Sequence, residues 1–348
     1  MKIIHTGDIH IGGAFQGLPK QKAELRKTEL IADFAMLCGY AKQTGVDAVI
    51  IAGDLFDKKD IAASEKQAVF SAIASVSPLP FYLIRGNHDI DVNLSGIPDN
   101  LYVFDNGFSV YEVGELRVGG CNFKDLSHLQ IPVLPKDKFN LITLHGDLGT
   151  DFSLTDLTEK NIDYLALGHI HKPMPVKEKL GGKGYYRYCG SLESRGFDET
   201  GARGFFLLEI DKNRVQNERF LSFAKRTVNA FFVDISLCQT YLDVENACLS
   251  ALSQAKEEDM IKITLCGKHA PELRKDIALL LERLSEKYFF VKMQDESSVL
   301  IDYSVYENDL TERGEFVREV GRYEMNERLR QEILEVGLKA LSGEEIDL

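Results

Sequence analysis

The sequence predicts an α/β protein with two β-sheets packed face to face and helices on the outside. Three observations lead to this class. Short apolar runs that suit buried strands alternate with segments of helical spacing over residues 1–210. Several of these runs are followed within three residues by Asp, Asn or His. The chain of 348 residues is also long enough for two or three domains.

Five short apolar runs are the clearest predicted strands. They cover residues 2–6, 48–52, 81–84, 140–144 and 164–167. Each is followed at once by a turn with oxygen or imidazole side chains. Ligands at the carboxyl ends of strands in an α/β protein point into one crevice, so we expect these turns to form the active site. The candidate residues are Asp8, His10, Asp54, Asn87, His88, His145, His169 and His171.

The residue types in these turns indicate a metal centre. Asp, Asn and His together suit borderline divalent ions such as Mn²⁺, Fe²⁺ or Zn²⁺. No cysteine is among them, which argues against a structural zinc site. The ligands are too many for one ion, so we infer two, with Asp54 as the natural bridging carboxylate. Two ions roughly 4 Å apart can activate water and hold both reacting oxygens of a phosphoester. His88 directly follows Asn87 on an expected strand-to-helix turn, and it would donate a proton to the leaving oxygen or stabilise the developing charge.

The remaining elements follow in chain order. Helical spacing predicts a helix over residues 23–43, and Ser64 is a candidate N-cap for a second helix reaching Val76. A hairpin around Gly114 is expected from strands at 108–113 and 115–120. Three further strands at 185–189, 204–210 and 215–221 are expected to be antiparallel.

Beyond a boundary near residues 224–229, the pattern predicts a smaller α+β domain. Strands at 231–236, 260–266 and 289–293 alternate with helices at 243–255 and 271–288, the latter starting with proline. Residues 294–322 have weak periodicity and indicate a linker. One apolar face then predicts a terminal helix, which either packs on its own domain or docks on a partner. Its apolar residues are Met325, Leu329, Ile333, Val336, Leu338 and Leu341.

Composition limits the class of protein. A hydrophobic content of 44% with 27% charged residues is typical of soluble globular proteins. No apolar run reaches the length of a membrane span, and the strand that starts at Lys2 leaves no room for a signal peptide. The six scattered cysteines lack a CxxC pair and suit reduced thiols. We therefore expect a cytoplasmic protein that does not associate with membranes.

A net charge of −13 argues against a nucleic-acid coat protein but not against a nuclease, which needs only a local basic strip. The candidates for such a strip are Lys20, Lys22, Arg26, Lys27, Lys58, Lys59, Arg187, Arg195 and Arg203. For each of them, the alternative is an ordinary solvated surface charge.

The five turns carry a resemblance to a known family. In order, Asp8-x-His10, Gly53-Asp54, Gly86-Asn87-His88-Asp89, His145-Gly146 and Gly168-His169-x-His171 resemble the signature of the calcineurin-like metallophosphoesterases. The stretches 5–12, 52–57, 189–193, 197–199 and 203–205 are similar to SbcD-type nucleases, the bacterial branch of the double-strand-break repair exonucleases. The resemblance covers residues 1 to about 300.

The resemblance implies a four-layer αββα sandwich with a small capping domain. It implies a nuclease domain at 1–225, a capping domain at 226–300, and a linker with a C-terminal partner-docking helix at 301–348. Asp8, His10, Asp54 and His171 would hold one divalent ion, and Asp54, Asn87, His145 and His169 the other. His88 would be the general acid or transition-state residue. Mn²⁺ is the expected metal, with Fe or Zn as alternatives. The implied partners are DNA, a coiled-coil ATPase of the SbcC type, and a second copy of the chain.

Some residues depart from the family pattern or stay open. Gly7 and Ile9 stand where SbcD proteins often have Ser and Trp, and Asp57 stands where archaeal and eukaryotic relatives carry a second catalytic His. Asp89 either orients a ligand or caps a following helix. The three histidines outside the ligand turns, His5, His128 and His269, are expected to be structural.

The function expected from the sequence is metal-dependent cleavage of DNA ends by hydrolysis of phosphodiesters. Two alternatives remain. One is a phosphoesterase for a small nucleotide or a phosphoprotein, against which the capping domain speaks. The other is a catalytically quiet subunit of an ATPase complex, against which the complete ligand set speaks.

Overall fold

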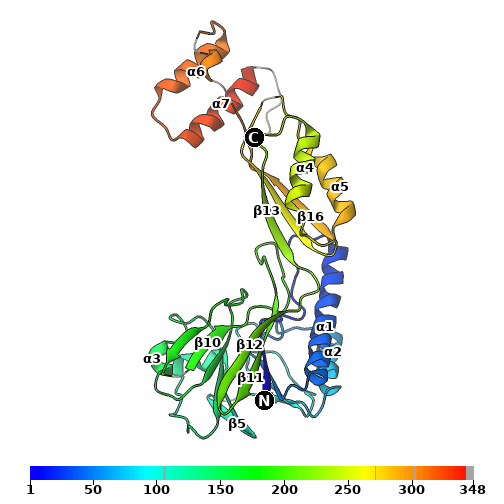
Figure 1. The fold of residues 1–348 in the computed structure, drawn as a ribbon, viewed down its shortest axis with the longest axis vertical. Helices are drawn as coiled ribbons and strands as arrows, with labels where there is room; N and C mark the ends of the chain where they lie inside the picture. The colour runs from blue at the N-terminus through cyan, green and yellow to red at the C-terminus, as the bar shows by residue number, and fades with distance from the viewer. Residues whose placement is uncertain (105–106, 183, 271, 301–302, 307, 342–348) are drawn as a thin grey trace. The chain divides into compact units, whose positions relative to one another are not determined.

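The computed structural model describes residues 1–104, 107–182, 184–270, 272–300, 303–306 and 308–341 (Figure 1). The chain divides into two compact units. Unit 1 comprises residues 1–229 and 258–260, and unit 2 comprises residues 230–257 and 261–348. All the predicted metal ligands belong to unit 1.

The first sheet of unit 1 has six strands in the order β12-β11-β1-β2-β3-β4. Strands β1 to β4 are mutually parallel, and β11 pairs antiparallel with both β1 and β12. The three runs expected at 2–6, 48–52 and 81–84 are strands of this sheet. The bounds are β1 (Lys2–Thr6), β2 (Ala48–Ile51), β3 (Phe81–Leu83), β4 (Leu101–Val103), β11 (Gly204–Asp211) and β12 (Arg214–Ser222).

The second sheet also has six strands, in the order β5-β6-β7-β8-β10-β9. The predicted hairpin at Gly114 is confirmed, since β5 and β6 pair antiparallel. The expectation that 185–189 is antiparallel and grouped with the two following strands is wrong in part: β10 pairs with β8 in parallel and lies in this sheet. The bounds are β5 (Ser109–Val113), β6 (Leu116–Gly120), β7 (Phe139–His145), β8 (Tyr164–Gly168), β9 (Glu178–Gly181) and β10 (Gly184–Tyr188).

Successive side chains of these strands enter different cores, because a strand presents alternate residues to opposite faces. Ile3 belongs to the core between the two sheets, whereas Ile4 packs against the helices. In the second sheet, Leu141 faces the first sheet and Ile142 faces outward into a third core. Both faces of the central strands β1, β2, β7 and β8 are therefore buried, which is why these strands contain nearly unbroken apolar runs. The result is the predicted α/β sandwich.

Helices α1 (Lys20–Gln43) and α2 (Ala63–Ala74) cover the first sheet and lie side by side (Figure 1). The helix α1 starts three residues before its predicted range, directly after Pro19. Ser64 is not the N-cap of α2; Ala62 holds that position and makes no side-chain cap. The outer face of the second sheet is covered by short pieces, α3 (Leu154–Leu157) and the 3₁₀ helix η1 (Phe123–His128).

Three of the basic residues considered for DNA binding are buried in unit 1. Arg26 is fully buried and pairs with Glu29 and Glu193. Arg187 pairs with Glu218 and is 9% exposed. Arg203 is 3% exposed. The prediction that these three arginines belong to a basic strip for DNA contact is wrong, because each guanidinium lies in the interior of unit 1.

Unit 2 begins with a three-stranded sheet in the order β13-β14-β16. Its strands are β13 (Val228–Asp234), β14 (Met260–Cys266) and β16 (Phe290–Asp295), and a two-stranded pair is formed by β15 (Lys268–His269) and β17 (Ser298–Val299). Helix α4 (Tyr241–Ala251) starts with a capping box between Thr240 and Asp243. Helix α5 (Ile277–Lys287) starts at the N-cap Asp276, later than predicted, and Pro271 lies outside the described residues.

The last part of unit 2 contains two helices, where the sequence indicated a linker and one helix. Residues 303–306 form the 3₁₀ helix η2 (Tyr303–Tyr306), and α6 (Glu312–Arg322) lies within the expected linker. Val317 and Val320 of α6 pack against Leu334 of α7 (Glu327–Leu341). The terminal helix thus packs on a neighbour within its own unit, while Leu329 and Val336 are 44% and 41% exposed.

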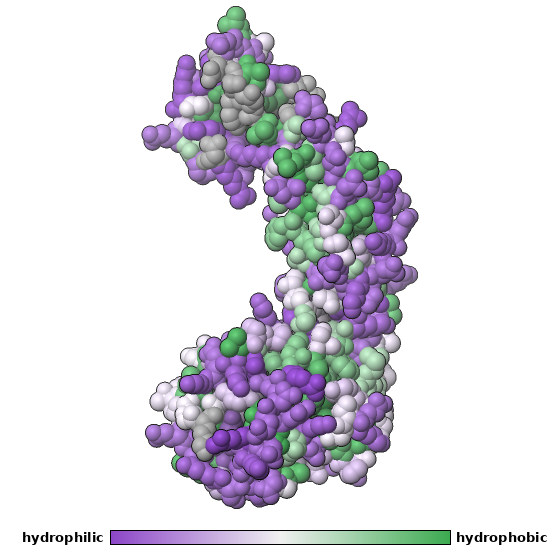
Figure 2. Space-filling model, in the orientation of Figure 1, coloured by the Kyte–Doolittle hydropathy of each residue, from purple (hydrophilic) through white to green (hydrophobic). Residues whose placement is uncertain are grey.

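The face of the molecule that Figure 2 shows is mainly hydrophilic over β10, with hydrophobic patches elsewhere. Exposed large hydrophobic residues in unit 2 include Phe232, Leu237 and Leu242. Within the described part of the chain, no helix combines the length and apolar character needed to cross a membrane.

Candidate metal centre

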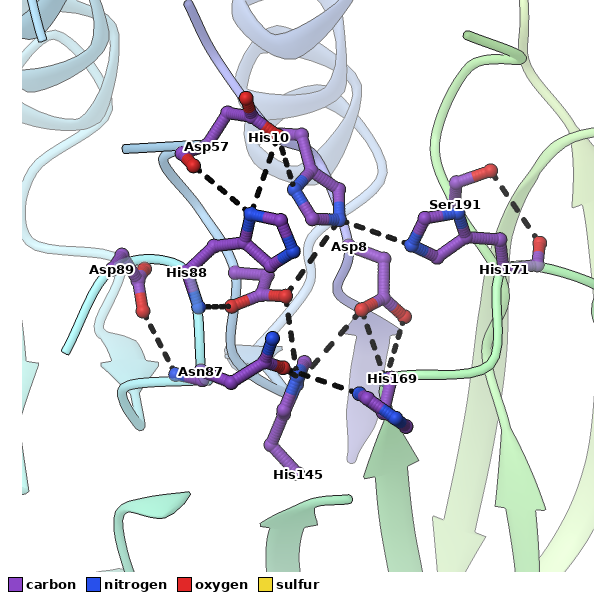
Figure 3. Close-up of polar contacts among 12 residues, drawn as sticks. Asp8, His10, Asp57, Asn87, His88, Asp89, His145, His169, His171 and Ser191 are labelled. Carbon is purple, nitrogen blue, oxygen red and sulfur yellow. Dashed lines mark hydrogen bonds and ion pairs between the residues drawn. The ribbon is translucent and has the colours of Figure 1, made fainter. Parts of the chain in front are cut away.

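The predicted ligand residues meet at the carboxyl ends of strands from both sheets (Figure 3). Asp8 and His10 follow β1, Asp54 follows β2, and Asn87 lies in the turns after β3. From the second sheet, His145 ends β7, and His169 and His171 follow β8. The sandwich therefore brings residues as far apart as Asp8 and His171 into one cluster.

The turns at this edge are tightly built. Asp8, His10 and Asp54 all have positive φ angles of 49°, 55° and 51°, which is uncommon for residues other than glycine. A Cβ on Gly86 would lie 2.1 Å from Asp54 Oδ1, and one on Gly168 would lie 1.9 Å from Ala52 O. Only glycine fits at these two positions, so the Gly-Asn-His-Asp and Gly-His-x-His motifs reflect a steric requirement.

Two imidazoles face each other in the first group of ligands. His10 Nε2 lies 3.1 Å from His171 Nε2. The other nitrogen of each ring lies beside a carboxylate: His171 Nδ1 is 2.6 Å from Glu199 Oε1, and His10 Nδ1 is 3.1 Å from Asp57 Oδ1. The Nδ1 of each ring thus lies beside a carboxylate oxygen, and the two Nε2 atoms face one another. At this separation one cation could be bound by both Nε2 atoms.

The second group is also a convergence of acceptors. His145 Nδ1 donates to Ala52 O at 2.8 Å, which leaves Nε2 facing inward. Around that nitrogen lie Asn87 Oδ1 at 3.0 Å and Asp54 Oδ2 at 3.2 Å. Asn87 Oδ1 is also 3.2 Å from His169 Nδ1. One carboxylate, one amide oxygen and two imidazoles thus converge, and this donor set fits a divalent cation.

Asp54 lies between the two groups. Its Oδ2 is 3.2 Å from His145 Nε2 and 3.7 Å from His10 Nε2. Burial alone would raise the pKa of this carboxyl, but the hydrogen bond and charge of His145 lower it to about 2. For His145, burial works against protonation, yet Asp54 and Asp8 raise its pKa to about 9. Concentrated negative charge at this point is what a bound cation would neutralise.

Asp8 is the third residue of the first group, with His10 and His171. Its carboxylate accepts the backbone N–H of His169 at 2.9 and 3.0 Å, which links the turn after β1 to the turn after β8. Burial raises the pKa of Asp8, against the lowering effect of the surrounding histidines. The carboxylate is 1% exposed and belongs to clusters with His10 and His171 and with Asp54 and His145.

His88 differs from the other imidazoles of the centre. Its side chain is 40% exposed, and its Nδ1 donates to the backbone carbonyl of Asp57 at 3.0 Å. Its own backbone N–H donates to Asp54 Oδ1 at 2.9 Å, so the residue is fixed to the ligand turn. The expected helix after this turn is absent; residues 85–93 form turns and bends. The His88 ring lies edge-on to the His10 ring, with the two ring centroids 4.8 Å apart.

Asp89 is a buried backbone anchor. Its Oδ1 accepts from the N–H of Gly86 at 2.8 Å and its Oδ2 from the N–H of Leu55 at 2.9 Å. Burial raises the pKa of this carboxyl to about 6. The capping alternative is wrong because no helix follows. Asp89 instead ties together the two turns that carry Asn87 and Asp54.

Sequence reasoning missed the carboxylates that orient the histidines. Asp57 and Glu199 lie behind His10 and His171, and Arg195 Nη1 contacts Asp57 Oδ1 at 2.6 Å. The Arg195 backbone N–H donates to Glu199 Oε2 at 2.9 Å. Glu199 belongs to the stretch 197–199 that resembles the family, but no feature of the sequence links it to His171. Carboxylates that hold metal-binding imidazoles commonly fix the tautomer and raise the basicity of the ligand.

The three histidines expected to be structural do not join the centre. His5 is buried between Tyr164 Oη, at 2.8 Å from its Nδ1, and Leu167 O. Burial lowers the pKa of His5 to about 3. His128 is exposed at the end of η1, and His269 lies in unit 2.

The basic residues beside the centre are fewer than the sequence suggested. Lys58 and Lys59 are exposed in the loop after Asp57, and Lys20 is exposed at the start of α1. Arg195 is 20% exposed and lines a small hollow of about 260 Å³ with Asp57, His88 and Glu199. Lys22 and Lys27 on α1 are half-buried, and Lys27 pairs with Glu24.

Comparison with known proteins supports the chemistry of this centre. Residues 1–173 match the family model described as calcineurin-like phosphoesterase. The chain is 25% identical over 249 residues to the uncharacterized metallophosphoesterase YhaO of Bacillus subtilis, covering 63% of this chain and 59% of that protein. It is 23% identical over 336 residues to the DNA double-strand break repair protein Mre11 of Methanosarcina mazei, covering 85% of this chain and 52% of that protein.

Among solved structures, a dimetal phosphatase from Danio rerio aligns with a TM-score of 0.41 at 11% identity, covering 64% of this chain and 99% of that one. The chain spans only about half to three-fifths of the length of the two sequence relatives.

Proposed function

The chain contains a calcineurin-like phosphoesterase domain over residues 1–173, and from this premise we propose that it is a metal-dependent nuclease of the SbcD type that hydrolyses phosphodiesters in DNA. The observation that carries the metal dependence is the pair of facing imidazoles, with His10 Nε2 only 3.1 Å from His171 Nε2. The likeness to double-strand break repair proteins supports DNA as the substrate.

Two divalent cations are proposed, with Mn²⁺ first and Fe or Zn as alternatives. Asp8, His10, Asp54 and His171 would hold one, and Asp54, Asn87, His145 and His169 the other. Bound in this way, the cations would supply an activated water and neutralise charge on the phosphodiester. Asp54 has the position that a bridging ligand needs, since its Oδ2 lies within 4 Å of an imidazole nitrogen of each group.

The role proposed for His88 follows from its surroundings. Because Nδ1 is engaged by the Asp57 carbonyl, Nε2 is the ring nitrogen that would carry a proton to the substrate. The Asp57 carboxylate also lies 3.5 Å from Nδ1. His88 would then donate that proton to the departing oxygen or stabilise its charge, as a general acid does.

The deciding experiment compares substrates on the purified chain with Mn²⁺. Linear duplex DNA, single-stranded DNA, a small chromogenic phosphodiester and a phosphomonoester are each assayed with and without a chelator. The proposal expects chelator-sensitive cleavage of DNA and of the diester. Hydrolysis of the monoester alone would instead identify a phosphatase for small substrates, and absence of all four activities with the metal sites loaded would indicate a quiet subunit.

We further propose that the protein works in the cytoplasm with a coiled-coil ATPase of the SbcC type and forms a homodimer. The docking segment would be the C-terminal helix, since Leu329 and Val336 of α7 are exposed. Changing these two residues to Asp should abolish co-purification with such an ATPase, whereas the same changes should leave cleavage of the small diester intact. Unchanged co-purification would remove α7 as the docking element.

A further inference from the structure

A basic groove lies at the end of the sandwich away from the metal centre. Two adjoining hollows of about 400 and 560 Å³ share Asp163, Gly182, Asn213 and Arg214 in their walls. Phe139, Asp163 and Gly184 mark the amino ends of the parallel strands β7, β8 and β10. The metal ligands follow the carboxyl ends of β7 and β8. The groove and the centre therefore occupy opposite edges of the second sheet.

The groove is positively charged, whereas the chain as a whole is negatively charged. The net charge of the protein is −13, yet the groove walls carry six basic side chains and three acidic ones. The basic residues are Lys136, Lys138, Lys177, Lys179, Lys212 and Arg214, and the acidic ones are Glu159, Asp163 and Glu178. Such a local excess attracts anions even when the whole protein is acidic.

Most of these cations are available to a ligand. Lys138 pairs with Glu112, but the other five are exposed and form no ion pair with any residue that the structure describes. The acids are less available: Glu178 Oε2 accepts from the Tyr186 hydroxyl at 2.5 Å, and Asp163 Oδ2 accepts from the backbone N–H of Asn140 at 2.9 Å. The wall thus presents more free positive than free negative charge.

The groove is formed jointly by both sheets. The turn between β11 and β12 holds Lys212 and Asn213 with φ angles of 49° and 56°, as a tight two-residue hairpin requires. Asn213 Nδ2 donates to Asp137 O at 3.1 Å, which fastens this turn to the loop before β7. On the opposite wall, Lys177 Nζ lies 4.4 Å above the ring of Tyr185. Basic side chains therefore line an open channel from two sides.

The proposed ligand follows from this arrangement. Compact ammonium groups suit phosphate oxygens, and contacts spread along an open channel suit a repeating backbone more than one enclosed small molecule. We propose that this groove binds the phosphate backbone of duplex DNA, independently of base sequence, and that the bound segment is different from the one in the metal centre. The identity of the ligand as DNA rests on the function proposed above.

The two segments must differ because of the geometry of the sheet. Strand β7 has seven residues, so the two edges are roughly 20 Å apart and face opposite ways. Duplex DNA is stiff over about 150 base pairs, so a short straight duplex at one edge does not bend round to the other. The groove would hold a second segment and let one chain bridge two pieces of DNA.

The test uses two double variants of the full chain, Lys177→Gln with Lys179→Gln and Lys212→Gln with Arg214→Gln, one for each wall. The matched control, Lys42→Gln with Lys66→Gln, removes the same charge from the helices that cover the first sheet. Binding is measured with Mn²⁺ present and a nuclease-resistant phosphorothioate duplex of about one helical turn, roughly 10 base pairs.

The unaltered chain should bind two such duplexes. Each groove variant should lose one of them and should lower the magnitude of the log–log salt slope by about 0.9 for each lost phosphate contact. The control should bind as the unaltered chain does. In a bridging assay, an immobilised duplex should capture a second, labelled duplex with the unaltered chain but not with the groove variants. All variants should cleave the unmodified short duplex normally when Mn²⁺ is present at saturating DNA.

Two results would overturn the proposal: groove variants that bind and bridge like the control, or variants that lose only inorganic phosphate binding and no DNA. These failures are separate from failure of the proposed function. If the unaltered chain cleaves DNA while the groove variants bind it unchanged, only the groove is refuted. If the variants lose DNA but the unaltered chain never cleaves it, only the nuclease proposal is refuted.

Discussion

His88 has the most exposed imidazole around the centre, with 40% of its side chain exposed against 31% for His169 and 24% for His171. We expect His88→Ala to reduce phosphodiester cleavage by about 10²–10⁴-fold, because a proton donor is lost while the ligand side chains stay in place. Metal analysis of the same sample should show an unchanged metal content. His128→Ala, at an exposed site on η1, is the matched control. Loss of metal in step with activity would instead make His88 a ligand.

Glu199 acts through another residue, His171, whose Nδ1 lies 2.6 Å from Glu199 Oε1. Replacing the carboxylate by an amide, Glu199→Gln, should weaken metal affinity by about 10–100-fold, because the imidazole loses the partner that fixes its orientation and basicity. A Mn²⁺ titration monitored by spectroscopy gives the affinity without an activity assay. Asp198→Asn, at the neighbouring residue that makes no contact with His171, should leave the affinity unchanged. An equal effect of both changes would argue against this positioning role.

At the scale of single residues, the sequence predicted the metal ligands but not the carboxylates that hold the ligand histidines in place. Asp8, His10 and Asp54 stand directly after apolar runs, so their position at a strand end can be inferred from pattern alone. Glu199 contacts a histidine 28 residues away through folding of an irregular loop, and no periodicity records that contact. Burial likewise could not be inferred for Arg26, because a basic residue on a helix normally faces solvent.

At the scale of elements, helix α1 is held by a buried ionic cluster. Glu29 accepts from Arg226 Nε at 2.8 Å and Arg226 Nη2 at 2.6 Å, and Arg26 Nη1 lies 3.0 Å away. Salt bridges to these arginines hold the pKa of Glu29 at about 2 although burial opposes this. We expect Glu29→Ala to lower the free energy of unfolding by about 3–5 kcal/mol, since Arg226 loses its carboxylate partner and Arg26 keeps only Glu193.

Urea unfolding gives this value, and Glu24→Ala provides the control on the same helix. Glu24 pairs with Lys27 at the surface, where its side chain is 60% exposed, and such pairs contribute roughly 0–1 kcal/mol. Similar losses from the two substitutions would mean that the buried cluster adds nothing beyond an ordinary surface pair.

The pairing of α6 with α7 depends on Leu334, which is 2% exposed and packs against Val317 and Val320. Leu334→Ala should destabilise this helix pair by about 2–5 kcal/mol, the usual cost of removing a buried leucine side chain. Hydrogen exchange of α6 and α7 should accelerate, while metal binding in unit 1 stays the same. Leu329→Ala, at a residue that is 44% exposed, is the control. Unchanged exchange would show that the two helices do not support each other.

The hydrophobic pattern of the sequence was sufficient to locate most helices and strands. It could not show which strands pair with each other in a sheet. The expected strand at 260–266 is β14 to the residue, because alternation and flanking turns define it. The placement of β10 beside β8 has no local signal, since a strand of either sheet has the same composition. Helix α6 was missed because its apolar stripe is narrow, with Val317 and Val320 set among charged residues.

At the scale of the whole molecule, charge is unevenly distributed. Acidic residues give the chain its net −13, and some of them, such as Asp8 and Asp54, are gathered in the metal centre. Length could predict a chain of more than one part, but neither length nor net charge could predict the location of free positive charge. That location depends on which lysines lack partners after folding, as Lys179 and Lys212 do among the described residues.

Strand β1 also determines when, during synthesis, the protein can fold. One edge of β1 pairs with β2, but its other edge pairs with β11, where Ile4 lies opposite Leu207. All the proposed ligands leave the ribosome before β11 does, and until then β1 has an unpaired edge, which favours aggregation. A chain ending at Gly201 should therefore be insoluble or bound by chaperones, whereas one ending at Asn229, after β11 and β12 are complete, should remain soluble. Residues 1–173 suffice to recognise the domain, but its completion awaits a strand made some thirty residues later.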